Sequence, residues 1–188
     1  MRVRKFSTGV FLFLLLAHLS ALAGVLPPTI EGLDLRNQAL ASVDFSKAKF
    51  GTVVVFLSTN CPCSTGHEKT LTKLYTDFSK RGFQFIGVHS NQDEGLTQAG
   101  SHFSGSKLPF PVIQDPHATL ANTFGALKTP HAYIVTPAKE ILFRGGVDEC
   151  HIAVNAKKHF LQTALDQMLD GKNPDPSEVR VLGCVIKR

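Results

Sequence analysis

An unbroken apolar run at residues 52–57 ends in a cysteine pair, and this junction constrains the fold more than any other feature of the chain. Short runs of β-branched and aliphatic residues are typical of a strand buried on both faces of a sheet. Apolar residues then recur at helical spacing from Leu71 to Phe78 and stop at a basic pair before Gly82, a typical helix end. A second apolar run at residues 83–88 completes the unit. The sequence therefore predicts two parallel strands joined by a right-handed helical crossover.

The cysteines of Cys61-Pro62-Cys63 lie where the first strand passes into the helix. Backbone N–H groups and the dipole at a helix N-terminus favour a thiolate over a thiol. The carboxyl end of a central strand is also where open α/β sheets carry their functional sites. The sequence therefore predicts redox chemistry at Cys61 and Cys63, with an inert buried pair or a static disulfide as the alternative.

The other elements predict one domain over residues 25–170, followed by a tail over residues 171–188. Short apolar alternations at residues 27–50 are typical of an N-terminal hairpin or edge strands, and residues 92–107 form a polar insertion that carries one helix. A short strand, a short helix, a β-hairpin and a final amphipathic helix are predicted at residues 110–114, 118–124, 131–144 and 152–169.

The first 23 residues have the pattern of an export signal. A basic start is followed by an apolar core and by the small-residue pattern Ala21-Leu22-Ala23. We expect cleavage to leave a periplasmic or secreted chain without a stable membrane span; a retained N-terminal anchor is the alternative. Loss of the three basic leader residues lowers the formal net charge from +5 to +2. Because no basic stripe with interleaved aromatic residues follows, nucleic acid is not a predicted partner.

The order of these elements resembles the thioredoxin fold, and within it the redoxin family of exported thiol-disulfide oxidoreductases and their alkyl hydroperoxide reductase relatives. The resemblance extends over residues 27–169 and depends on residues 54–62, on Thr129-Pro130 and on residues 143–148. The closing sequence Gly-Cys-Val-Ile-Lys at residues 183–187 is similar to the last segment of one group of such redoxins. The resemblance implies an α/β fold in which helices flank a central mixed β-sheet.

The resemblance also implies roles for the site residues. Cys61 takes the place of the attacking cysteine, and Ser64 stands where a Cys-x-x-Cys motif has its second cysteine. Cys61 therefore pairs either with Cys63 or with a distant resolving cysteine. The candidates for that cysteine are Cys184 in the tail and Cys150 after the hairpin, although a structural bridge involving these two is an equal alternative.

Thr129 and Pro130 are the predicted substrate-binding residues. In this fold a cis-proline faces the active cysteine, so the backbone of Thr129 would offer an edge to which an extended substrate peptide can hydrogen-bond. Arg144 and Asp148, at the end of the predicted hairpin, are expected to form a solvated ion pair without a catalytic role.

Two enzymatic hypotheses follow. The first is a thiol-disulfide oxidoreductase that acts on protein thiols or disulfides, needs a redox partner protein and needs no cofactor. This hypothesis requires the sulfur of Cys61 to be ionised and reachable by solvent.

The second hypothesis is a thiol peroxidase, because Ser58 matches the hydroxyl position of the peroxiredoxin motif Thr-x-x-Cys-Pro. The arginine that such enzymes place against the nucleophile is not evident, since Thr129 and Pro130 occupy that region.

A third hypothesis is a copper(I)-binding assembly protein without turnover. Thiolates and imidazoles suit copper(I), and His67, His89 and His131 are the candidate partners of the two cysteines. We predict no metal site, however, because His67 falls on the polar face of its helix, where a solvent-facing side chain is expected. His131, if protonated, would raise the thiolate fraction of Cys61.

Overall fold

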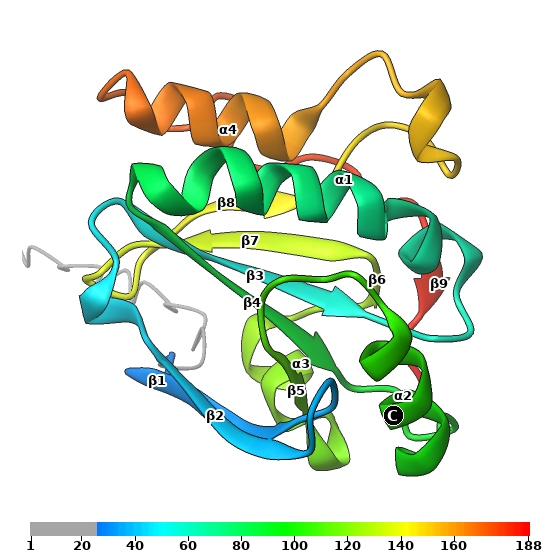
Figure 1. The fold of residues 1–188 in the computed structure, drawn as a ribbon. Helices are drawn as coiled ribbons and strands as arrows, with labels where there is room; N and C mark the ends of the chain where they lie inside the picture. The colour runs from blue at the N-terminus through cyan, green and yellow to red at the C-terminus, as the bar shows by residue number, and fades with distance from the viewer. Residues whose placement is uncertain (1–25) are drawn as a thin grey trace, which may run out of the picture.

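A computed structural model describes residues 26–188, so the predicted signal peptide lies outside the described residues. The centre of the molecule is a seven-stranded mixed sheet in the order β2-β1-β5-β4-β3-β7-β8 (Figure 1). This architecture confirms the predicted α/β fold. The strands of the sheet are β1 (Thr29–Asp34), β2 (Ala39–Asp44), β3 (Gly51–Leu57), β4 (Phe83–His89), β5 (Val112–Gln114), β7 (His131–Val135) and β8 (Ile141–Gly145).

The strand–helix–strand unit predicted around the cysteines is present. β3 pairs in parallel with β4, and α1 (Pro62–Phe78) connects them. Every residue of β3 is buried because side chains on both of its faces enter hydrophobic clusters. Gly82 adopts a left-handed conformation with φ 101° after the last turn, as the predicted helix end requires.

The helices form two layers, one on each face of the sheet (Figure 1). Leu71, Leu74 and Phe78 of α1 share one hydrophobic cluster with apolar residues of α2 and α4. Phe124 of α3 belongs to the cluster on the opposite face, together with residues of the N-terminal hairpin. The remaining helices are α2 (Leu96–Gly105), α3 (Thr119–Phe124) and α4 (Phe160–Leu169), and none in residues 26–188 is long and apolar enough to cross a bilayer.

The predicted final helix is shorter than expected at its N-terminal end. Residues 152–159 contain only the 3₁₀ turn Ala153–Asn155, and α4 begins at Phe160. The carboxylate of Glu149 explains the break, because it accepts the backbone N–H groups of Lys157 and Lys158 at 2.6 and 2.7 Å. These bonds draw the chain back toward the end of β8 and interrupt the helical pattern.

The tail returns to the domain and ends near the start of α1 (Figure 1). Its first part lies beside β8, where the N–H of Val179 donates to the carbonyl of Arg144 at 3.1 Å. Its last part forms β9 (Cys184–Val185), which pairs antiparallel with the two-residue strand β6 (Lys128–Thr129). In Figure 1, β9 lies near the start of α1, and the C-terminus lies beside α2.

Candidate functional site

Cys61 occupies the N-cap position of α1, directly after β3. Its backbone N–H donates to the hydroxyl of Ser58 at 3.1 Å, and its carbonyl accepts the N–H of Thr65 at 3.0 Å. The hydroxyl of Ser64 accepts the N–H of Ser58 at 2.9 Å. Ser64, which stands where a Cys-x-x-Cys motif has its second cysteine, therefore holds the loop before Cys61.

The predicted cis-proline is present and faces this cysteine. The Thr129–Pro130 peptide bond is cis, and the carbonyl oxygen of Thr129 lies 3.1 Å from the sulfur of Cys61. The structure thus brings Cys61, Thr129 and Pro130 together, as the sequence predicted.

The expectation that the sulfur of Cys61 is reachable by solvent is wrong for this conformation. Only 1% of Cys61 is exposed. The tail contributes to this burial, because β9 pairs Cys184 directly with Thr129, whose carbonyl oxygen lies 3.1 Å from the sulfur of Cys61. Cys184 itself is exposed, and all four cysteines are free thiols.

The two facing thiols differ in acidity. Burial raises the pKa of Cys61, but hydrogen bonds from the side chain of Cys184 and from the backbone N–H of Ser64 outweigh it and hold the pKa below its usual value. Conversely, the hydrogen bond to Cys61, burial and the charge of Cys61 raise the pKa of Cys184 to about 11. This arrangement makes Cys61 the more acidic of the two thiols.

Cys63 and Cys150 have other surroundings. Cys63 lies in the first turn of α1, and its sulfur is 3.0 Å from Nδ1 of His151. Burial and the neighbouring charge of Cys61 raise the pKa of Cys63. Cys150 is half-buried in the loop after β8, and its N–H donates to Asp148 at 2.8 Å.

A buried carboxylate that sequence reasoning missed organises the loop before Cys61. The side chain of Glu94 accepts hydrogen bonds from the hydroxyl of Ser58, from the N–H and hydroxyl of Thr59 at 2.6 and 2.8 Å, and from the amide of Asn91 at 2.8 Å. Nε2 of His89 lies 2.9 Å from the same carboxylate. Burial raises the pKa of Glu94, but the bonds from His89, Ser58 and Thr59 dominate and hold it far below its usual range.

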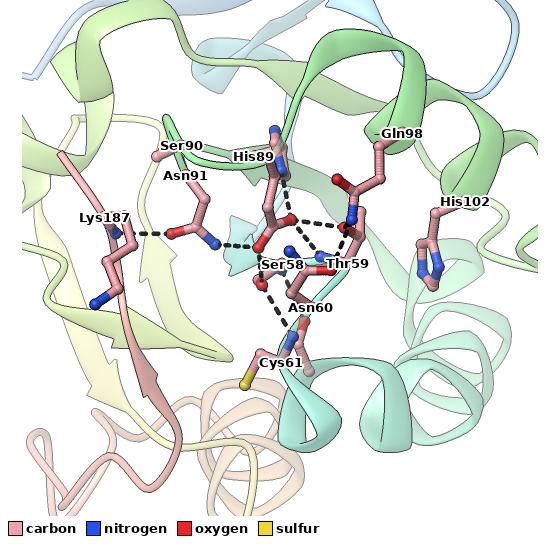
Figure 2. Close-up of polar contacts among 12 residues, drawn as sticks. Ser58, Thr59, Asn60, Cys61, His89, Ser90, Asn91, Gln98, His102 and Lys187 are labelled. Carbon is pink, nitrogen blue, oxygen red and sulfur yellow. Dashed lines mark hydrogen bonds and ion pairs between the residues drawn. The ribbon is translucent and has the colours of Figure 1, made fainter.

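The same network extends to the tail (Figure 2). The side-chain oxygen of Asn91 accepts the N–H of Lys187 at 2.9 Å, and the N–H of Gln92 donates to the carbonyl of Lys187 at 2.9 Å. One chain of contacts therefore connects Cys61, through Ser58, Glu94 and Asn91, to the segment that carries Cys184.

The histidines named in the copper hypothesis have other partners. His67 is not solvent-facing: it is 2% exposed, its Nδ1 lies 2.5 Å from the carbonyl of Cys63, and its Nε2 lies 3.0 Å from Asp148. His89 is engaged with Glu94. Within residues 26–188, no three Cys, His, Asp or Glu side chains are grouped as ligands for a metal ion.

Two further expectations need correction. Burial is the main cause that lowers the pKa of His131 to about 4, so this ring is neutral at pH 7 and does not supply a charge to Cys61. Arg144 and Asp148 do not form an ion pair with each other. Arg144 contacts Glu178 of the tail at 2.6 Å, and Asp148 is buried against His67.

Comparisons with known proteins agree with this architecture. The model of the AhpC/TSA family matches residues 27–144. A comparison with curated proteins finds no match. Among solved structures, an uncharacterized conserved protein from Geobacillus kaustophilus has a TM-score of 0.76 at 22% identity, covering 86% of this chain and 89% of its own. A hypothetical protein from Sinorhizobium meliloti has a TM-score of 0.73 at 24% identity, covering 85% and 90%.

StoA from Bacillus subtilis is a more distant structural neighbour. It has a TM-score of 0.54 at 16% identity and covers 64% of this chain and 89% of its own. At these identities the likeness concerns the fold, which is that of thioredoxin.

Proposed function

This chain belongs to the AhpC/TSA family, and from that premise we propose that it is an exported thiol-disulfide oxidoreductase whose nucleophile is Cys61 and whose resolving cysteine is Cys184. The observation that carries the proposal is that Thr129 links the two cysteines: its carbonyl oxygen lies 3.1 Å from the sulfur of Cys61, and β9 pairs Cys184 with this same residue. We assign residues 1–23 to a cleaved signal, residues 25–170 to the redoxin domain and residues 171–188 to a tail that supplies the second cysteine. The mature protein would act in the periplasm or outside the cell.

The first step is attack by the Cys61 thiolate on a substrate disulfide after the tail has moved aside. One substrate sulfur bonds to Cys61, and the other leaves as a thiolate. The hydrogen bonds that lower the pKa of Cys61 raise the fraction of its thiolate. Thr129 offers its backbone to the substrate once β9 has left it.

The second step is attack by Cys184 on the sulfur of Cys61, which releases the second substrate thiolate and forms a Cys61–Cys184 disulfide. The pKa of Cys184 is raised by its bond to Cys61 and by the charge of Cys61. In the mixed disulfide Cys61 carries no charge, so this cause disappears. Cys184 therefore ionises more readily at the moment when it is needed as a nucleophile.

Cysteine variants test this assignment in a disulfide-reduction assay with insulin, with dithiothreitol as the electron donor. We expect Cys61→Ser to abolish catalysis, because no thiolate remains to attack the substrate. We expect Cys150→Ser to turn over as the wild type does. We expect Cys184→Ser, reduced beforehand and mixed with insulin after the dithiothreitol has been removed, to accumulate a mixed disulfide between Cys61 and the substrate. Undiminished turnover by Cys61→Ser would contradict the proposal.

A thiol peroxidase is the second candidate, and the burial of Cys61 favours it. A peroxide is small enough to reach a sulfur that a protein disulfide cannot reach without movement of the tail. Attack by Cys61 would give a sulfenic acid and release water or an alcohol, and condensation with Cys184 would release water and form the same disulfide. Consumption of hydrogen peroxide that depends on Cys61 and exceeds the rate with insulin would favour this reaction.

A further inference from the structure

The C-terminal segment lies across β6 in the way an extended peptide would lie there. β9 pairs Cys184 with Thr129 and Val185 with Lys128, and the N–H of Ile186 donates to the carbonyl of Leu127 at 2.9 Å. Backbone pairing with an exposed edge is a general mode of peptide recognition, in which hydrogen bonds give affinity and side-chain sites give specificity. This edge has two such sites, one on each side of the cysteine.

The first site lies immediately before the cysteine. A Cβ atom at Gly183 would lie 2.0 Å from the carbonyl oxygen of Thr129, and the residue has φ +148°. Both the close approach and the backbone conformation exclude a side chain. A strand that presents a cysteine to Cys61 in this register must therefore have glycine at the preceding position.

The second site lies two residues after the cysteine. Ile186 is 3% exposed and belongs to the same hydrophobic cluster as Phe124 and Ala126. Val185 between them is 58% exposed and therefore imposes little selection. Beyond Ile186, the hydrogen bonds of Asn91 and Gln92 are with the backbone of Lys187 and so do not select its side chain.

We propose that this edge is the docking site for an extended Gly-Cys-x-aliphatic segment of a partner protein, and that the tail of the chain occupies it when no partner is bound. The inference rests on the proposed function, because it concerns the strand that brings a second sulfur to Cys61. It adds the class of substrate: a cysteine preceded by glycine and followed at the second position by Ile, Leu or Val.

Synthetic peptides test the proposal on the full-length Cys184→Ser protein. A nonapeptide with the sequence of residues 180–188 is prepared with its cysteine as a mixed disulfide with 5-thio-2-nitrobenzoate. Attack by Cys61 joins the peptide to Cys61 and releases the coloured thionitrobenzoate dianion, and mass spectrometry maps the modified cysteine. Matched peptides carry alanine in place of the glycine or serine in place of the isoleucine.

We expect the parent peptide to modify Cys61 at least tenfold faster than either matched peptide at the same concentration. Adding Ile186→Asp to the protein should accelerate the parent peptide further, because it loosens the competing tail. Equal rates for all three peptides would overturn the docking site while leaving Cys61 as the nucleophile. If neither the peptides nor the small disulfide 5,5′-dithiobis(2-nitrobenzoate) modifies Cys61 in the folded protein, the proposed function itself fails.

Discussion

Replacement of Gly183 by alanine should expose Cys61 by displacing the tail. A Cβ atom there would lie 2.0 Å from the carbonyl oxygen of Thr129, and the residue keeps a positive φ. Overpacking of this kind costs about 1–3 kcal/mol. Because 1.4 kcal/mol corresponds to a factor of ten in an equilibrium, the population with an undocked tail should rise roughly 5- to 150-fold.

The rate at which iodoacetamide modifies Cys61 measures that population. Cys61 is 1% exposed while the tail is docked, so alkylation proceeds through the open form when opening and closing are fast. We therefore expect Gly183→Ala to accelerate alkylation of Cys61 by the same factor. Gly105→Ala is the matched control, because a Cβ at Gly105 meets nothing within 4 Å. Equal rates for Gly183→Ala, the control and the wild type would refute the reasoning that the tail shields this sulfur.

Three further predictions concern individual polar side chains. The pKa of Glu94 is held below its usual range, so its contribution to stability is present above about pH 4.3 and is lost as the pH falls below that value. Thermal unfolding of Glu94→Gln should therefore show a smaller fall in Tm between about pH 5 and pH 3 than the wild type does. Parallel curves for the two proteins would contradict this prediction. Cys184→Ala should shift the pH profile of Cys61 alkylation to higher pH than Cys184→Ser does, because only serine keeps a hydrogen-bond donor at this position. Coincident profiles would show that this donor does not lower the pKa of Cys61. Asp148→Ala should lower the free energy of unfolding by about 1–3 kcal/mol in urea titrations, because the N–H of Cys150 and the buried ring of His67 lose the carboxylate that faces them, and an unchanged free energy of unfolding would show that these contacts are not structural.

Local patterns were sufficient to predict the framework of the site. The apolar run before Cys61 and the helical spacing after it correctly located β3, α1 and β4. The Thr129–Pro130 bond was predicted to be cis and is cis. These features depend on residues that are close in the sequence or on a single recurring dipeptide, so periodicity and motif reasoning reach them.

The sequence did not reveal what holds the site closed. Glu94 lies in a polar insertion 36 residues from Ser58, and no periodicity relates the two. One signal was available: the hydroxyls of Ser58 and Thr59 follow a fully buried strand and therefore need an acceptor. The position of Cys184 depends on the return of the tail to β6, a long-range contact that the buried Ile186 stabilises and that a local pattern cannot specify.

The central claim is that Cys61 and Cys184 form one redox pair, and disulfide mapping tests it most directly. The mature protein is oxidised with a small excess of oxidised glutathione or of hydrogen peroxide, digested without reduction and analysed by mass spectrometry. The account predicts a Cys61–Cys184 link as the main product with either oxidant. A predominant link between Cys61 and Cys63, or between Cys150 and Cys184, would contradict it.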